Sequence, residues 1–104
     1  MKNVYIIVHE THGYMDGETF VDIEVFNDLK SSNLYFDSMK SNIIEEYINY
    51  DGCKTIQELS DKNYFYIDEE PTLNGDSYLY IDLDDYGYDK LRIYKKPIMS
   101  FNDN

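Results

Sequence analysis

Two apolar segments near the beginning of the chain have the spacing of β-strands. Residues 4–8 form an uninterrupted run of β-branched and aromatic residues, which is typical of a buried strand. Residues 21–25 alternate strictly between apolar and acidic residues, the period of a strand with two different faces. Asp16-Gly17, a frequent hairpin turn, lies between them. We therefore predict a β-hairpin with Val8 opposite Val25, so that the apolar faces stay in register.

The middle of the chain has the three- and four-residue spacing of an amphipathic helix. Ser31 or Ser32 is a suitable N-cap, and Gly52 suits the C-terminal end. Thr55 and Glu58 have the spacing of a capping box and predict one or two further helical turns. The apolar stripe of the main helix consists of Phe36, Met39, Ile43, Ile44, Tyr47 and Ile48.

Apolar and polar residues alternate again in the last third of the chain. Residues 64–68, 78–83 and 90–94 each have the period of a strand. Apolar side chains of the last two segments share one face if Leu83 lies opposite Leu91. We therefore predict three further strands, of which the last two form a hairpin.

Together these segments predict an α+β fold with an antiparallel sheet of about five strands, in the order β-β-α-β-β-β, and one main helix packed on one face. The chain has 104 residues, the size of one domain. We predict a single domain over residues 1–99 and a frayed C-terminal tail over residues 100–104.

The charge of the chain limits its partners. Acids outnumber bases by 21 to 9, and the formal net charge is −12, which repels nucleic acid and anionic lipid and favours a basic protein surface. The single cysteine excludes an internal disulfide framework. The first apolar run is too short for a signal peptide or a membrane span. We predict a cytoplasmic protein that binds neither nucleic acid nor membranes directly.

The acids are concentrated in two stretches. Residues 10–28 contain six acids and no lysine or arginine, and residues 61–89 contain nine acids and only Lys62. We expect many of these acids, with neighbouring tyrosines, to point away from the helix-covered face and to imitate the phosphates of a nucleic acid. The alternative is that the acids only keep the protein in solution. The predicted contact residues are Asp22, Glu24, Tyr66, Asp68, Tyr80, Asp82, Asp84 and Asp85.

The sequence contains few candidates for catalysis. His9 and His12 lie three residues apart in a predicted strand or turn, whereas a zinc-protease motif needs a spacing of four on a helix. On a strand they would point to opposite faces, and we expect His9 to pair with Glu24 across the hairpin. No motif gives Cys53 a catalytic partner. We therefore predict no catalytic residue, metal or cofactor; a small enzyme or metal-dependent domain using both histidines with carboxylates is the alternative.

Three segments of the chain resemble a group of small bacterial and phage domains: residues 2–9, residues 24–26 and residues 65–69. Domains of that group begin with a similar strand ending in histidine, turn into a helix and return in a strand ending in an acid. The resemblance covers about the first two-thirds of the chain and implies the layout but no activity. It also leaves a phage or mobile-element setting open, in which small acidic proteins that block defence nucleases are a recognisable type.

We accordingly predict a non-catalytic protein-binding module. The sharper form of this prediction is an inhibitor that occupies the basic nucleic-acid-binding surface of a nuclease or defence complex, as anti-CRISPR, anti-restriction and immunity proteins do. A self-associating structural module that pairs through exposed strands is a further alternative.

Overall fold

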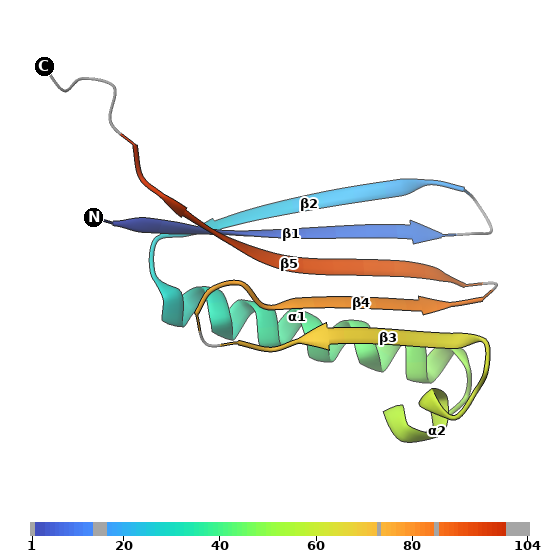
Figure 1. Ribbon diagram of the computed structural model, residues 1–104. Helices are drawn as coiled ribbons and strands as arrows, with labels where there is room; N and C mark the ends of the chain where they lie inside the picture. Colours follow the sequence, from blue (N-terminus) through green and yellow to red (C-terminus); the bar gives the residue numbers. More distant parts are fainter. Residues whose placement is uncertain (1, 14–16, 73, 85, 100–104) are drawn as a thin grey trace, which may run out of the picture.

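The computed structural model describes residues 2–13, 17–72, 74–84 and 86–99. The predicted α+β class, with a five-stranded antiparallel sheet and one main helix, is confirmed (Figure 1). The predicted tail at residues 100–104 lies outside the described residues. In chain order the elements are β1 (Asn3–Gly13), β2 (Thr19–Phe26), α1 (Leu29–Tyr50), α2 (Ile56–Ser60), β3 (Phe65–Glu70), β4 (Tyr78–Leu83) and β5 (Gly87–Pro97).

The order of the strands in the sheet is β2-β1-β5-β4-β3. The two longest strands, β1 and β5, lie side by side in the middle of the sheet and pair from Asn3 with Pro97 to Gly13 with Gly87. The first and last strands of the chain therefore form the centre of the sheet, and β2 and β3 are its edges. No helix of the described residues is long and apolar enough to cross a membrane.

Both helices begin at side-chain caps. Asp28, and not Ser31 or Ser32, caps α1, and its Oδ1 accepts a 2.7 Å hydrogen bond from the backbone N–H of Ser31. That hydrogen bond lowers the pKa of the Asp28 carboxyl. The predicted cap of α2 is confirmed, because Thr55 Oγ1 accepts from the N–H of Glu58 at 3.2 Å. The correction at α1 reflects the stronger acceptor three residues earlier, which satisfies an N–H that would otherwise have no partner.

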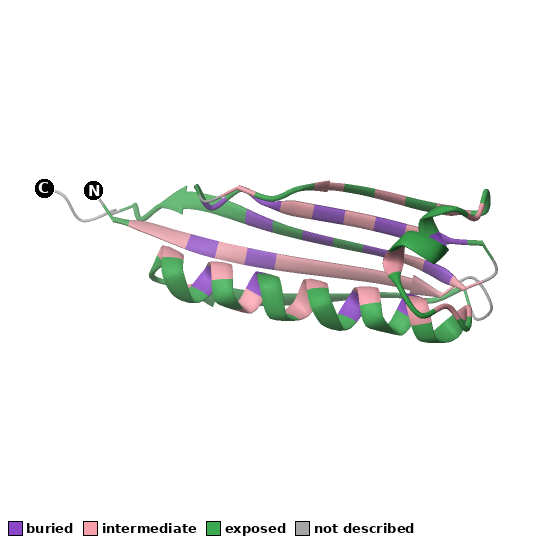
Figure 2. Ribbon diagram, turned by 90° about the horizontal axis from the view of Figure 1, so that it is seen from below, coloured by how far each residue is buried: buried purple, intermediate pink, exposed green. Residues whose placement is uncertain are grey.

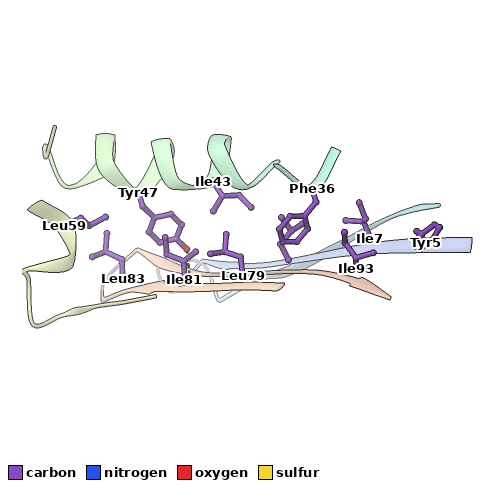
Figure 3. Packing of buried hydrophobic residues seen from close by; sticks show 11 residues of the cluster. Tyr5, Ile7, Phe36, Ile43, Tyr47, Leu59, Leu79, Ile81, Leu83 and Ile93 are labelled. Atoms are coloured by element: carbon purple, nitrogen blue, oxygen red, sulfur yellow. Dashed lines mark hydrogen bonds between the residues drawn. The ribbon is translucent and has the colours of Figure 1, made fainter. Parts of the chain in front are cut away.

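The core lies between α1 and one face of the sheet (Figure 2). Figure 3 shows the inward side chains of α1 meeting those of β1, β4 and β5, with α2 closing one end. Every strand that contributes to the core does so with alternate residues, because successive side chains point to opposite faces. The buried apolar residues are Tyr5, Ile7, Phe36, Ile43, Tyr47, Leu59, Leu79, Ile81, Leu83, Leu91 and Ile93.

The register of β4 and β5 differs from the predicted one by four residues. Leu91 lies opposite Leu79, and Leu83 lies opposite Gly87. The turn is tighter than expected, since the N–H of Tyr86 donates to the carbonyl of Leu83 at 3.0 Å. Gly87 has φ 146°, and a Cβ there would lie 2.0 Å from a backbone oxygen of β1. Because the shift is even, the apolar residues of both strands still face α1.

The register of β1 and β2 also differs, by two residues. Val8 lies opposite Ile23 and not opposite Val25. The hairpin closes further from its tip than predicted, with the N–H of Gly13 donating to the carbonyl of Glu18 at 3.2 Å. The predicted turn residue Asp16 lies outside the described residues. Tyr5 and Ile7 of β1 are buried against α1, and Asp22 and Glu24 pair with odd-numbered residues of β1. The acids of β2, and not its aliphatic residues, therefore lie on the helix side of the sheet.

Candidate protein-binding face of the sheet

The face of the sheet opposite α1, called the open face below, carries no helix or strand among the described residues (Figure 2). Each of its strands contributes the side chains that alternate with the buried ones. The open face has two parts of different chemistry. The aliphatic strip belongs to β1 and β2, and the tyrosine half belongs to β3, β4 and β5.

The aliphatic strip consists of six branched side chains on two paired strands. On β2 the residues Val21, Ile23 and Val25 are 53%, 60% and 60% exposed. Ile23 lies opposite Val8, and Val25 lies opposite Ile6, so the side chains form one continuous surface. Exposed apolar patches of this kind mark interaction sites in folded proteins. The complete strip is Val4, Ile6, Val8, Val21, Ile23 and Val25.

Aromatic rings cross the tyrosine half in a row. The ring of Tyr80 lies 5.8 Å from that of Tyr66 and 5.9 Å from that of Tyr88, centroid to centroid. His12 of β1 stacks on Tyr88 at 5.2 Å. The row therefore runs from the edge strand β3 to the central strand β1.

The charged groups of the tyrosine half interact with its rings and hydroxyls. Lys90 Nζ lies over the rings of Tyr80 and Tyr88, 5.8 and 5.3 Å from their centroids. Tyr80 donates to Asp82 at 2.9 Å, and Tyr88 donates to Glu10 at 2.6 Å. These acids are already hydrogen-bonded within the face, which reduces their ability to imitate free phosphates.

The same arrangement is repeated further along the strands. Arg92 lies over the rings of Tyr78 and Tyr94, at 5.6 and 5.4 Å. Tyr78 donates to Asp68 at 3.1 Å, and this hydrogen bond raises the pKa of the Tyr78 phenol. The tyrosine half is thus a set of paired charges and rings, unlike the aliphatic strip.

The predicted contact residues do not share one surface. Four of them lie together on the open face, where Tyr66 is opposite Asp82 and Asp68 is opposite Tyr80. Asp84 lies at the turn after β4, and its backbone N–H donates to the backbone carbonyl of Tyr64 at 3.1 Å. Asp85 lies outside the described residues.

Asp22 and Glu24 lie on the helix side, which corrects the expectation that they point away from it. Asp22 is opposite His9, the position predicted for Glu24. Both carboxylates line a groove of about 210 Å³ with His9, Tyr35 and other residues of β1 and α1. Burial raises the pKa of Tyr35, and the charges of Glu24 and Asp22 raise it further. The two acids remain exposed at the β2 edge of the sheet.

The structure also contains a buried polar cluster that our sequence analysis did not predict. Asp89 is 6% exposed and accepts hydrogen bonds from Tyr47 Oη at 2.8 Å and Thr11 Oγ1 at 2.8 Å. His9 Nε2 lies 2.6 Å from Asp89 Oδ1. Burial raises the pKa of the Tyr47 phenol, and the Asp89 charge and hydrogen bond raise it further. The alternation that buries Leu91 also places Asp89 inside, so this signal was present in the sequence.

This cluster has a histidine and a carboxylate but does not unite the two histidines. His9 belongs to the helix side, and His12 lies on the open face against Tyr88. Within the described residues, no three His, Cys, Asp or Glu side chains are arranged to hold a metal ion. Both oxygens of Asp89 are occupied by hydrogen bonds from the protein itself, as in a structural polar network.

The surroundings of Cys53 also disfavour a role for its thiol as a nucleophile. Its Sγ lies 3.4 Å from Asp51 Oδ2, to which it donates. Burial raises the pKa of the Cys53 thiol, and the interaction with Asp51 raises it further. The reactive thiolate is therefore less populated than in an ordinary cysteine.

Comparisons with known protein families, curated proteins and solved structures found no match to this chain. The resemblance to small bacterial and phage domains therefore remains a prediction.

Proposed function

We propose that this protein is a non-catalytic binding module that docks a protein partner through the aliphatic strip. The observation that carries the proposal is the exposure of Val21, Ile23 and Val25, each more than half accessible, in register with the aliphatic residues of β1. When a partner covers a water-exposed strip of branched side chains, the complex is stabilised by about 25 cal/mol per Å² of apolar area buried. The strip is therefore the expected centre of the contact.

The tyrosine half is the natural continuation of such a contact. Tyrosine and arginine are enriched among residues that dominate binding energies. Arg92 of β5 lies directly opposite Val8 of the strip, so the two parts of the open face adjoin. A partner centred on the strip would reach Tyr94, which lies opposite Ile6.

The partner we propose has an apolar centre with a basic rim. The segment from residue 10 to residue 28, which includes β2, contains six acids and no lysine or arginine. Two copies of this chain packed strip to strip would bring two such segments together, and like charges across an interface are unfavourable. A basic partner gains from the same field, which also steers its approach.

The sharper proposal is that the partner is a nucleic-acid-handling enzyme, whose basic surface this protein occupies as an anti-CRISPR, anti-restriction or immunity protein would. Its support is the net charge of −12. It predicts that binding weakens as salt rises, because ions screen exposed charges over about 8–10 Å.

The test is an affinity capture from host lysate with tagged wild-type protein and two variants. Ile23→Glu places a charge in the strip, and Leu34→Glu is the matched control, since Leu34 is an equally exposed aliphatic residue of α1 at 62%. We expect the same partner with wild type and L34E and its loss with I23E, while circular dichroism shows all three folded. Capture of that partner by I23E at wild-type levels would refute the proposal. Light scattering of the isolated protein separates self-association from binding to another protein.

A further inference from the structure

A pocket of about 320 Å³ lies where the C-terminal half of α1 meets the hairpin ends of β1 and β5. Its volume is within the range of small-ligand sites, about 300–1,000 Å³. It is separate from the aliphatic strip, because none of the strip residues lines it; its walls come from α1, the hairpin ends of β1 and β5, and the turn before β5, and they include His12. The residues that matter for its chemistry are Thr11, Glu46, Tyr47, Tyr50, Tyr86 and Asp89.

Three tyrosine rings form the aromatic wall of the pocket. Tyr86, from the turn between β4 and β5, meets Tyr47 edge to face, with centroids 4.9 Å apart and planes at 79°. Its ring centroid also lies 4.3 Å from that of Tyr50, a residue that is 50% exposed at the end of α1. The negative face of such rings attracts cations within about 6 Å of the centroid.

Carboxylates and the helix end make the pocket electronegative. Glu46 and Asp89 both line it. The helix α1 ends at Tyr50 with no basic residue in its last turn, so the partial negative charge of its C-terminus is not neutralised there. Burial raises the pKa of the Tyr86 phenol, and the charges of Glu46 and Asp89 raise it further. Glu46, Asp89 and the C-terminal end of α1 therefore favour positive charge at this place.

We propose that this pocket binds an organic cation, an alkylammonium group held against Tyr50 and Tyr86 and neutralised by Glu46. Asp89 adds negative charge but no direct contact, because its oxygens accept from Tyr47, Thr11 and His9. A bare metal ion is disfavoured, since it needs several oxygen or nitrogen ligands, whereas aromatic rings suit quaternary and alkylated ammonium. The group belongs either to a small free molecule or to a lysine side chain of a protein.

The experiment is an NMR titration of isotope-labelled protein with tetramethylammonium chloride, with sodium chloride at equal ionic strength as the reference. We expect saturable shifts at the C-terminal turn of α1 and at Tyr86 with tetramethylammonium only. A second arm uses a short peptide containing trimethyl-lysine. Tighter binding of this peptide identifies a protein side chain as the source of the cation, and tighter binding of free tetramethylammonium identifies a small molecule.

Variants connect the binding to the proposed residues. Tyr86→Leu should bind about 2- to 30-fold more weakly, the range expected for the loss of one cation–π contact, and Tyr86→Phe should retain binding because the ring remains. Glu46→Gln should weaken binding, whereas Glu45→Gln, the neighbouring exposed acid outside this pocket, should not. Because Glu46 is exposed, Glu46→Gln leaves the core intact, and it tests the proposal even if Tyr86→Leu unfolds the protein.

Two outcomes overturn the inference: shifts that are the same with sodium chloride, or equal affinities for Glu46→Gln, Glu45→Gln and wild type. The Ile23→Glu variant should bind tetramethylammonium as wild type does. The cation site in the pocket and the protein-binding role of the aliphatic strip can therefore be refuted independently of each other.

Discussion

Strands β2 and β4 have the same pattern and opposite surroundings. In both, branched aliphatic residues alternate with polar ones over consecutive positions. The aliphatic residues of β4 are at most 1% exposed, and those of β2 are 53–60% exposed. Ile81 and Ile23 thus occupy equivalent places in the sequence pattern, one in the core and one on the surface.

The difference shows what alternation specifies. A period of two says that a strand has two unlike faces, but the element packed against the sheet decides which face is interior. Strand β1 is apolar on both faces, with Ile7 buried and Ile6 half-buried, so it accepts the aliphatic side of β2 on either face. In the observed register that side lies with Ile6 and Val8 on the open face.

The largest expected difference is between truncations of the buried and the exposed isoleucine. Ile81→Ala should lower the free energy of unfolding by about 2–5 kcal/mol, because it leaves a cavity in the core. Ile23→Ala should change it by no more than about 0.5 kcal/mol, as is usual for exposed positions. Urea denaturation followed by circular dichroism measures both. Similar losses for the two variants would show that β2 is covered in solution.

A smaller effect on the free energy of unfolding is expected from removing the Tyr47 hydroxyl, which lies on the helix-covered face. Tyr47→Phe removes the hydrogen bond from Oη to buried Asp89 and should cost about 1–3 kcal/mol, because the carboxylate oxygen loses its donor. The control is Tyr94→Phe, which changes an exposed tyrosine of the open face. A neutral result for Tyr47→Phe would mean that water replaces the phenol.

The same tyrosine predicts the response to alkaline pH. Its pKa is raised in the folded protein, so above the ordinary value of about 10 the unfolded chain loses a proton that the folded protein keeps. Stability should be unaffected below that pH and then fall by up to about 1.4 kcal/mol per pH unit. Urea midpoints measured across this range should fall less steeply for Tyr47→Phe. Identical slopes would assign the effect to other tyrosines.

The smallest effect concerns the helix that covers one face of the sheet. Asp28→Ala removes the cap at the start of α1 and should lower the thermal midpoint, because an N–H of the first turn loses its acceptor. Ser31→Ala, at one of the positions predicted for the cap, should lower it less. A larger effect at Ser31 would contradict the observed cap.

Part of the candidate site could be predicted, and the reason is local. Alternation within β3 and β4 places four of the predicted contact residues on the open face, and a shift in register by an even number of residues would leave them there. These residues are Tyr66, Asp68, Tyr80 and Asp82. Asp22 was predicted for the same face and lies on the other, because that assignment depended on which side of β2 the helix covers. Asp89 could have been placed in the core from the alternation with Leu91.

The sequence by itself determined the elements, their periods, the cap of α2 and the excess of negative charge, because each of these depends on neighbouring residues or on composition. Only the tertiary structure decided the two registers, the hydrogen bond between Tyr47 and Asp89, and the exposure of the aliphatic strip. These properties depend on how segments far apart in the chain meet. A hairpin can shift by two or four residues without changing which side chains share a face, so the pattern alone leaves several pairings equally consistent until loops, glycine contacts and the helix select one.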